Sequence, residues 1–369
     1  MNIKSLLLGS AAGLVAVSGA QAADAIVYAE PEPVEYVRVC DMYGAGFFYI
    51  PGTETCLQVS GLVWYQMGTA DEGGNYHGFT ADRWNKSTRA RVNFDARSDT
   101  EWGTLRGYVR IQGDFNAYNA AVASRTGSSD GRGSIGFDQA FLELGGFRAG
   151  YTESAWVASQ GAGVAQFGSH TWGGLSYGYQ QRQLISYTFG GASGFAATVA
   201  LEDDSNDNYT PDVVGVVSYN QAWGGVWAKA AYDEDRGTNL VEVDDGGWAA
   251  QAGLQLNVPN APGSSFRLIG YYADNANAYS VGSEWSVLAS YRQQFSQTLA
   301  ASVGAQYFSG IHDLSVADGI ETDLDGWQAE AALIWTPVTN FEVRAEYVYT
   351  DIDLRPSTNS GFLRFQRSF

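Results

Sequence analysis

Arginine recurs at alternate positions in two neighbouring segments, and this spacing constrains the fold more than any other feature. Residues two apart share one face of a β-strand, whereas on a helix they would spiral around the axis. Read as strands, both segments place polar and charged side chains on one face and mostly apolar ones on the other. The polar face holds Arg89, Arg91, Asn93, Asp95 and Arg97, then Arg106, Tyr108, Arg110, Gln112 and Asp114.

The first 22 residues have the three parts of a secretory signal peptide. Lys4 supplies the positive charge, residues 6–17 form the apolar core, and an Ala-Gln-Ala cleavage site ends at position 22. We therefore expect residues 1–22 to direct export across a bacterial inner membrane and to play no part in the fold. Without them, acidic residues outnumber basic ones by about two to one. This balance argues against nucleic acid as a partner.

The two cysteines, Cys40 and Cys56, are predicted to form a disulfide, because an exported protein reaches a compartment where such bonds persist. Bridging a loop of about 17 residues adds roughly 3 kcal/mol on chain-entropy grounds. Two buried thiols are the alternative interpretation. We expect residues 23–56 to form an N-terminal periplasmic segment, which begins as a linker rich in proline and acid and is closed by the disulfide.

The composition after the leader favours an all-β protein. No apolar stretch reaches the ~18–20 residues that a membrane helix needs. Charged residues make up only 17% of the chain, against ~25% in ordinary soluble domains. Glycine, at 45 of 369 residues, and aromatic residues, at 14%, are abundant.

Segments of about ten residues with alternating polarity recur through the rest of the chain, and sixteen are predicted as strands. They are roughly 57–67, 88–98, 103–115, 135–145, 147–153, 184–190, 194–203, 212–221, 225–233, 247–257, 265–274, 284–295, 298–308, 326–336, 341–350 and 360–369. Short connections alternate with long, polar, acidic ones. An even number of strands with this alternation is the layout of an outer-membrane β-barrel. We therefore predict a transmembrane antiparallel β-barrel of about 16 strands over residues 57–369.

The arginine face must then look into the barrel. An arginine that faces lipid near the midplane costs roughly 2–4 kcal/mol, so five would cost about 10–20 kcal/mol. That sum exceeds or exhausts a typical folding stability of 5–15 kcal/mol. Asp95, Asp114 and Glu143 offset only part of the repulsion between the arginines. A barrel of sixteen strands leaves an aqueous channel, so the chain is predicted to be a pore.

Three stretches of the sequence resemble the alphaproteobacterial general porins. They are the leader MNIKSLLLGSAAGLVAVSGAQAADA, the stretch EYVRVCDMYGAGFFYIPGTETCLQVSG and the ending RFQRSF. The resemblance implies a sixteen-stranded homotrimer for passive diffusion of small hydrophilic solutes and ions, integral to the outer membrane. It also implies that the third external loop, here 154–183, folds inward opposite a basic wall made of Arg89, Arg91, Arg97, Arg106 and Arg110, with Arg148 as a further candidate.

The loop departs from the family pattern, because such loops usually carry several acidic residues. Residues 154–183 contain no Asp or Glu, although Glu153 stands at the base. The loop offers Trp156 and Trp172 instead, with Arg182 at its end. We expect a constriction of net positive charge behind strongly negative outer loops, so the sign of ion selectivity stays open.

Other functions are weighed against the pore. A substrate-specific sugar channel would use Trp156, Trp172, Tyr177 and Tyr179 to stack on sugar rings, whereas these aromatics could simply pack the loop against the wall. A barrel enzyme is disfavoured, because the three histidines of the chain lie in predicted loops with no catalytic arrangement. No cofactor or metal is expected. Outer-membrane lipid and lipopolysaccharide are the expected surroundings, and a receptor or adhesin role would be an addition.

Overall fold

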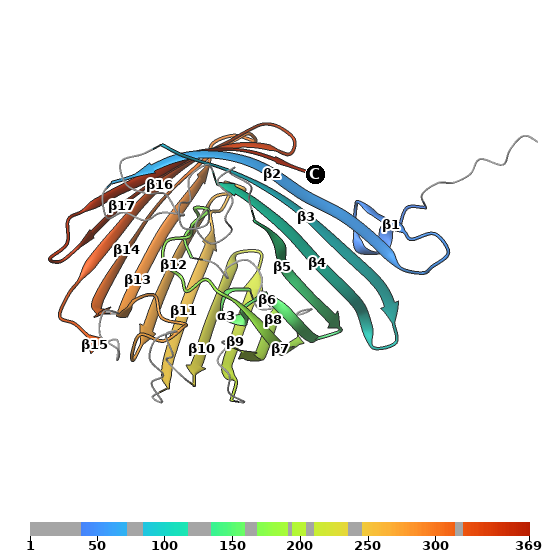
Figure 1. Ribbon diagram of the computed structural model, residues 1–369, viewed down its shortest axis with the longest axis horizontal. Helices are drawn as coiled ribbons and strands as arrows, with labels where there is room; N and C mark the ends of the chain where they lie inside the picture. Colours follow the sequence, from blue (N-terminus) through green and yellow to red (C-terminus); the bar gives the residue numbers. More distant parts are fainter. Residues whose placement is uncertain are drawn as a thin grey trace, which may run out of the picture. The chain divides into compact units, whose positions relative to one another are not determined.

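The computed structural model describes residues 38–71, 84–116, 134–158, 168–190, 194–203, 210–234, 246–313 and 320–369. The predicted signal peptide, 1–22, and the linker that follows it lie outside these residues. Residues Val39–Phe369 form one compact unit. Figure 1 shows the strands of this unit following one another in chain order around a barrel.

Sixteen strands of the described residues close into the barrel, each antiparallel to its neighbours. They are β2 (Cys56–Ala70), β3 (Asn85–Thr100), β4 (Gly103–Asn116), β5 (Ser134–Leu144), β6 (Phe147–Glu153), β7 (Gln181–Gly190), β8 (Phe195–Asp203), β9 (Asp212–Gln221), β10 (Gly224–Asp233), β11 (Gly247–Asn257), β12 (Ser265–Ala273), β13 (Ser283–Gln294), β14 (Leu299–Asp313), β16 (Gly326–Val338), β17 (Phe341–Ile352) and β18 (Thr358–Ser368). Two short strands are added: β1 (Phe47–Tyr49) pairs with β2, and β15 (Ile320–Glu321) pairs with the end of β14.

The prediction of a sixteen-stranded barrel is confirmed, and the connections alternate between long and short as expected. One boundary differs in a way that matters for the loop. Strand β7 begins at Gln181, three residues earlier than predicted, because Gln181, Arg182 and Gln183 pair with the end of β6. The long connection is therefore 154–180, called the inner loop below, and Arg182 belongs to the barrel wall.

The barrel closes where β18 pairs with β2. At one end of this seam, Phe369 and Gly61 exchange two main-chain hydrogen bonds, at 2.9 and 3.0 Å. A Cβ atom on Gly61 would lie 2.2 Å from the carbonyl oxygen of Arg91 and 2.7 Å from the ring of Phe369. The close approach of three chain segments therefore requires a residue without a side chain at position 61.

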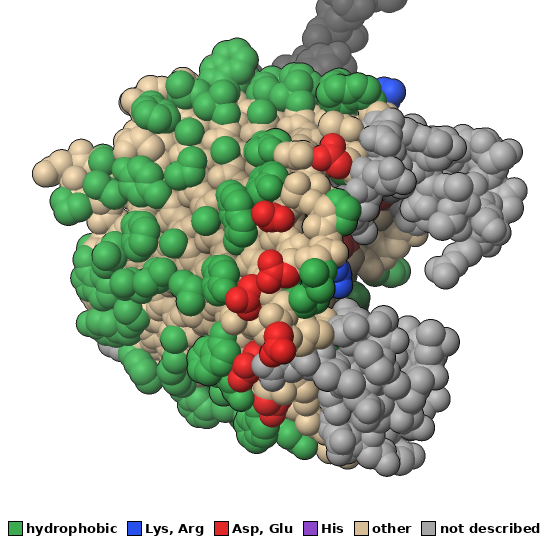
Figure 2. Space-filling model, turned by 90° about the vertical axis from the view of Figure 1, so that its left-hand side faces the viewer, with side chains coloured by type: hydrophobic (Ala, Val, Ile, Leu, Met, Phe, Trp, Pro, Cys, Tyr) green, Lys and Arg blue, Asp and Glu red, His purple; other side chains and the backbone are tan. Residues whose placement is uncertain are grey.

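The outer face of the barrel is apolar. On β2 the exposed side chains include Val59, Val63 and Tyr65, and Figure 2 shows apolar side chains spread over one face of the molecule, with acidic ones gathered towards one margin. Aromatic pairs join neighbouring strands near the long connections: Tyr232 with Trp248, Tyr272 with Trp285 and Trp327 with Tyr349. Among the described residues, no helix is both long and apolar enough to cross a bilayer.

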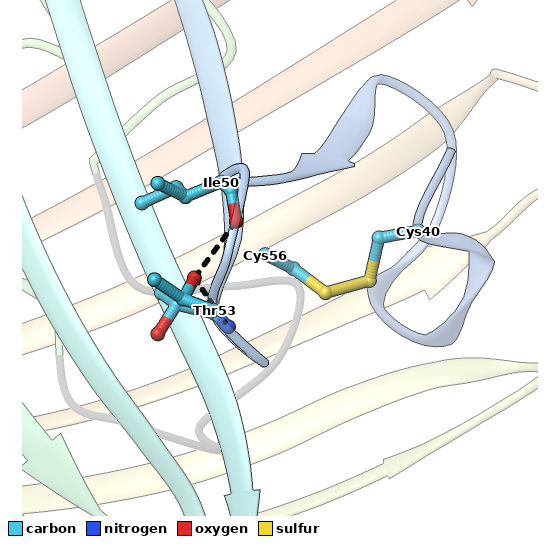
Figure 3. The surroundings of a disulfide bond; sticks show 5 residues. Cys40, Ile50, Thr53 and Cys56 are labelled. Atoms are coloured by element: carbon cyan, nitrogen blue, oxygen red, sulfur yellow. Dashed lines mark hydrogen bonds between the residues drawn. A yellow bond between two sulfur atoms is a disulfide. The ribbon is translucent and has the colours of Figure 1, made fainter. Parts of the chain in front are cut away.

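A disulfide closes the segment ahead of the barrel. Cys40 and Cys56 are bonded as predicted, with Cα atoms 6.0 Å apart. Figure 3 shows the bond beside the turn in which the hydroxyl of Thr53 donates to the carbonyl of Ile50 at 3.0 Å. Both cysteines are buried with Phe47. The ring of Phe47 lies 5.1 Å from Cζ of Arg97, so this segment contacts the arginine face of β3.

Candidate functional site

Strand pairing places the predicted arginines and most of their acidic neighbours on one face of the sheet. Directly opposed residues of antiparallel strands share a face. Arg89 on β3 faces Trp64 on β2 and Asp114 on β4. Further along the same strands, Arg97 faces Arg106, and Arg106 faces Glu143 on β5. Glu143 is in turn opposite Arg148 on β6, so the set extends over four neighbouring strands.

This face is the inner one, because the inner loop packs against its continuation on the neighbouring strands β2 and β18. Trp64 and Gln66 share the arginine face of β2, and Gln66 is opposite Arg364 of β18. The ring of Trp172, in the inner loop, lies 3.9 Å from Cζ of Arg364. The prediction that this loop folds inward is confirmed. We call Arg89, Arg91, Arg97, Arg106, Arg110 and Arg148 the arginine wall.

Every arginine of the arginine wall lies within ion-pair distance of a carboxylate. The tight pairs have nitrogen–oxygen distances of 2.6–2.8 Å: Arg89 with Asp114, Arg97 with Asp95, Arg106 with Asp95 and Arg148 with Glu143. Arg106 also pairs with Glu143 at 3.2 Å. Looser pairs join Arg110 to Asp138 at 3.4 Å, Arg91 to Asp138 at 3.6 Å and Arg110 to Glu153 at 3.9 Å.

Asp138 reaches the arginine wall through a β-bulge that sequence alternation does not reveal. On β5, Gln139 is paired with Arg110 and Phe137 with Ile111, so Asp138 is the extra residue between two successive pairs. Phe137 is 71% exposed on the outer face, while Gln139 is buried on the inner face. Strict alternation would place Asp138 beside the outward Leu142. The bulge turns it inward instead.

The inner loop is held against the far wall by polar contacts with five strands. The imidazole of His170 contacts the hydroxyls of Ser290 and Ser265, at 2.7 and 2.8 Å. The hydroxyl of Thr171 donates to Glu330 at 2.5 Å, and the main-chain N–H of Trp172 donates to Glu346 at 2.7 Å. Ser176 donates its N–H to Gln306 at 3.0 Å.

His170 is held in its neutral form. Burial lowers its pKa to about 3, and the positive charges of Arg267 and Arg292 add to the effect. A protonated imidazole would stand beside two guanidinium groups in a partly dry site. The contacts of this histidine with two hydroxyls identify it as an anchor of the loop rather than as a catalytic base.

The beginning of the inner loop forms one helical turn, α3 (Ala155–Ala158), and the predicted site residue Trp156 is placed differently from expectation there. Trp156 is only 1% exposed and packs against Tyr279 at a ring distance of 5.7 Å, so its ring faces no open lumen. Its carbonyl accepts a hydrogen bond from the buried Nζ of Lys229 at 2.6 Å. Arg182 lies on β7, opposite Thr152 of β6, and donates to Gln180 at 3.0 Å.

The base of the loop touches the arginine wall. Nη1 of Arg148 donates to the carbonyl of Ala158 at 3.4 Å, and Glu153 pairs with Arg110. Trp172 and Tyr179 keep 41% and 53% of their surface exposed. The arrangement therefore combines a charged wall on β3–β6 with a loop fastened to β12–β17.

Comparison with known proteins is consistent with this architecture. A family model described as "Porin subfamily" matches residues 24–363. The chain is similar to porin Omp2b of Brucella suis biovar 1, with 36% identity over the whole of both chains. Among solved structures, it is similar to OmpT of Vibrio cholerae in a trimer form and to an anion-selective porin from Comamonas acidovorans. Each has 11% identity and a TM-score of 0.57, and the match covers 86% of this chain and 100% of that structure.

Proposed function

The chain belongs to the porin subfamily and forms an integral outer-membrane channel for passive diffusion of solutes, and we propose that the arginine wall and the inner loop together bound its narrowest section. One observation carries the proposal. The loop leaves the barrel next to Arg110, where Glu153 pairs with that arginine, and is fastened to the opposite wall where His170 contacts Ser265 of β12 and Ser290 of β13. Solutes that cross the barrel therefore pass between this loop and the charged wall. The protein is a channel, not an enzyme.

The charge of this section supports weak rather than strong ion selectivity. The six arginines of the wall are accompanied by five carboxylates, Asp95, Asp114, Asp138, Glu143 and Glu153. With all of them ionised, the fixed charge is one positive unit. This net positive charge is smaller than the six arginines alone would give, and ions of both signs are expected to pass.

Single-channel recording of the purified protein tests the proposal directly. We expect steady ionic current, with a zero-current potential in a salt gradient that departs only slightly from zero. Methanethiosulfonate reagents added to a Gln112→Cys variant should reduce that current, because Gln112 lies on the wall and accepts hydrogen bonds from Arg91. Modification of the thiol without any change in conductance would show that the wall does not bound the narrow section.

A substrate-specific sugar channel is the second candidate, favoured by the exposed rings of Trp172 and Tyr179 in the inner loop. Trp156 no longer supports it, because its ring is buried. Liposome swelling with sugars and amino acids of equal size separates the two functions. Equal rates at equal size support general diffusion, and faster swelling with sugars would favour the second candidate.

We also propose how the channel assembles and what surrounds it. The Vibrio cholerae OmpT structure is a trimer form, and a homotrimer is proposed for this chain as well, with lipid and lipopolysaccharide around it. Residues 23–56 are proposed to lie on the periplasmic side. Cross-linking of the detergent-solubilised protein should give a band of three chains.

A further inference from the structure

The guanidinium of Arg364 is buried among aromatic rings where the barrel seam meets the inner loop. Its Cζ is 3.9 Å from the ring centroid of Trp172 in the loop and 4.8 Å from that of Trp64 on β2. The ring of Phe362 lies 4.7 Å away on its own strand. Arg364 is 1% exposed, and its Nη1 has no hydrogen-bond partner among the described residues. Aromatic rings therefore provide much of the surroundings of this guanidinium.

The same rings connect the inner loop to the arginine wall. Trp64 also lies 5.3 Å from Cζ of Arg89, which forms a tight ion pair with Asp114. Contacts thus run without interruption from Arg89 through Trp64 and Arg364 to Trp172. A guanidinium over an indole is attracted by the electrons of the ring, and the attraction is stronger where water is excluded. We call these four residues the stack.

Polar contacts fix the orientation of both ends of the Arg364–Trp172 contact. The side-chain oxygen of Gln66 accepts a hydrogen bond from Nε of Arg364 at 2.7 Å, and a second from Nη2. On the loop side, Oε1 of Glu346 accepts a hydrogen bond from the main-chain N–H of Trp172 at 2.7 Å. The same oxygen accepts one from Arg344 at 2.9 Å. The guanidinium plane and the loop backbone are each held independently of the ring contact.

We propose that Arg364 is a positioning residue of the channel, which docks the inner loop through Trp172 and so keeps the opening beside the arginine wall at one width. The inference rests on the proposed function, because a fixed loop matters only if the loop bounds the open section. A lysine would keep the charge but lose the flat surface that lies on both indoles. Glutamine would lose both the charge and that surface.

The test compares Arg364→Gln, Arg364→Lys and Trp172→Leu with the wild-type protein in planar bilayers. Arg367→Gln is the matched control, since Arg367 lies on the same strand as Arg364 but donates to the main-chain carbonyls of Asn340 and Ser368, outside the stack. We expect brief closures to become at least tenfold more frequent with Arg364→Gln and Trp172→Leu. The Lys variant should be intermediate, and the control should stay within twofold of wild type.

A second measurement reports on the loop without requiring current. The two native cysteines are bonded to each other, so a spin label on Tyr179→Cys reports from the inner loop alone. Label mobility should rise with Arg364→Gln and Trp172→Leu and stay unchanged with Arg367→Gln. Unchanged mobility in both variants of the stack would overturn the inference, and so would unchanged closure frequency.

Absence of current in the wild type would overturn the proposed function instead, while label mobility would still decide the role of Arg364. Should Arg364→Gln not fold, Trp172→Leu, which leaves every barrel strand intact, carries both measurements.

Discussion

Asp138 and Arg110 form an ion pair of 3.4 Å across β5 and β4, although alternation along β5 would send Asp138 to the lipid. The bulge that brings them together also places Asp138 3.6 Å from Arg91. One carboxylate thus stands between two arginines of the wall. It lowers the net positive charge of that wall from two units to one.

Asp138→Asn is therefore expected to shift the zero-current potential in a potassium chloride gradient toward anion preference. Folding should change by less than about 1 kcal/mol, because pairs this loose contribute little. Asp353→Asn, at an exposed position outside the strands, is the control and should leave the potential unchanged. An identical potential in the Asp138 variant would mean that current does not pass near this carboxylate.

The arginines themselves give the opposite prediction. Replacing Arg89, Arg91, Arg106 and Arg110 with glutamine removes four positive charges and leaves all five carboxylates of the wall. The zero-current potential should move toward cation preference, by more than Asp138→Asn moves it the other way. Arg367→Gln, which removes an exposed arginine bonded to the carbonyls of Asn340 and Ser368, is the control. A potential that does not move in the fourfold variant argues against the wall as the narrow section.

Docking of the inner loop should depend on pH through His170. Because burial lowers the pKa of His170 to about 3, the docked loop stays unprotonated at acidic pH, whereas a released loop takes up a proton below about 6.5. Docking is thus unaffected above pH 6.5 and weakens by about 1.4 kcal/mol per pH unit between there and pH 3. The charged groups facing the ring are Arg267 and Arg292.

The measurement is the mobility of the Tyr179→Cys spin label between pH 7 and pH 5. Over this interval docking should lose about 2 kcal/mol in the wild type. His170→Gln keeps a neutral polar side chain at every pH, so its mobility should change less over the same interval. Equal pH dependence in both proteins would assign the effect to other groups.

Closure of the barrel depends on the absent side chain at Gly61. Gly61→Ala forces a Cβ atom against the carbonyl of Arg91 and the ring of Phe369, and is expected to destabilise the seam by about 1–3 kcal/mol. The control is Gly107→Ala, where an added Cβ meets nothing within 4 Å. The temperature at which the folded band converts to the unfolded band on gels should fall for Gly61→Ala only. Equal temperatures would show that the seam can relax around the methyl group.

Loss of the disulfide should loosen the segment ahead of β2. Replacing Cys40 and Cys56 with serine removes roughly 3 kcal/mol of chain-entropy stabilisation, so limited proteolysis within residues 39–56 should become faster. Treating the wild type with reductant should have the same effect, while the serine variant should not respond to it. Slow cleavage in the serine variant would show that the packing of Phe47 on Arg97 holds the segment without the bond.

Alternation alone was sufficient to predict most of this fold. Strand β3 keeps one polar face and, from Ala90 to Ala96, one apolar face, so its arginines and the barrel could be predicted from residue spacing. The inward position of Asp138 could not be predicted, because a bulge changes which side chains point inward without changing the composition. The burial of Trp156 was not predicted for a related reason. A loop has no regular alternation of side chains, so the burial of this ring depends on contacts with distant strands, such as the one with Lys229. Arg364 carried no local signal, since its partners are brought together only when the barrel closes.

Because the seam joins β2 to β18, the last strand of the chain, the barrel can close only after β18 has been synthesised. Gln66 and Arg364, which meet across the seam, are 298 residues apart in the chain. Every earlier strand has a partner before β18 exists, yet β2 keeps an open edge until the last strand arrives. An unpaired strand edge can pair with strands of other chains and so promote aggregation. The exported polypeptide must therefore be shielded from its neighbours until β18 is available, and a protein synthesised only as far as β17 would remain an aggregation hazard rather than a smaller pore.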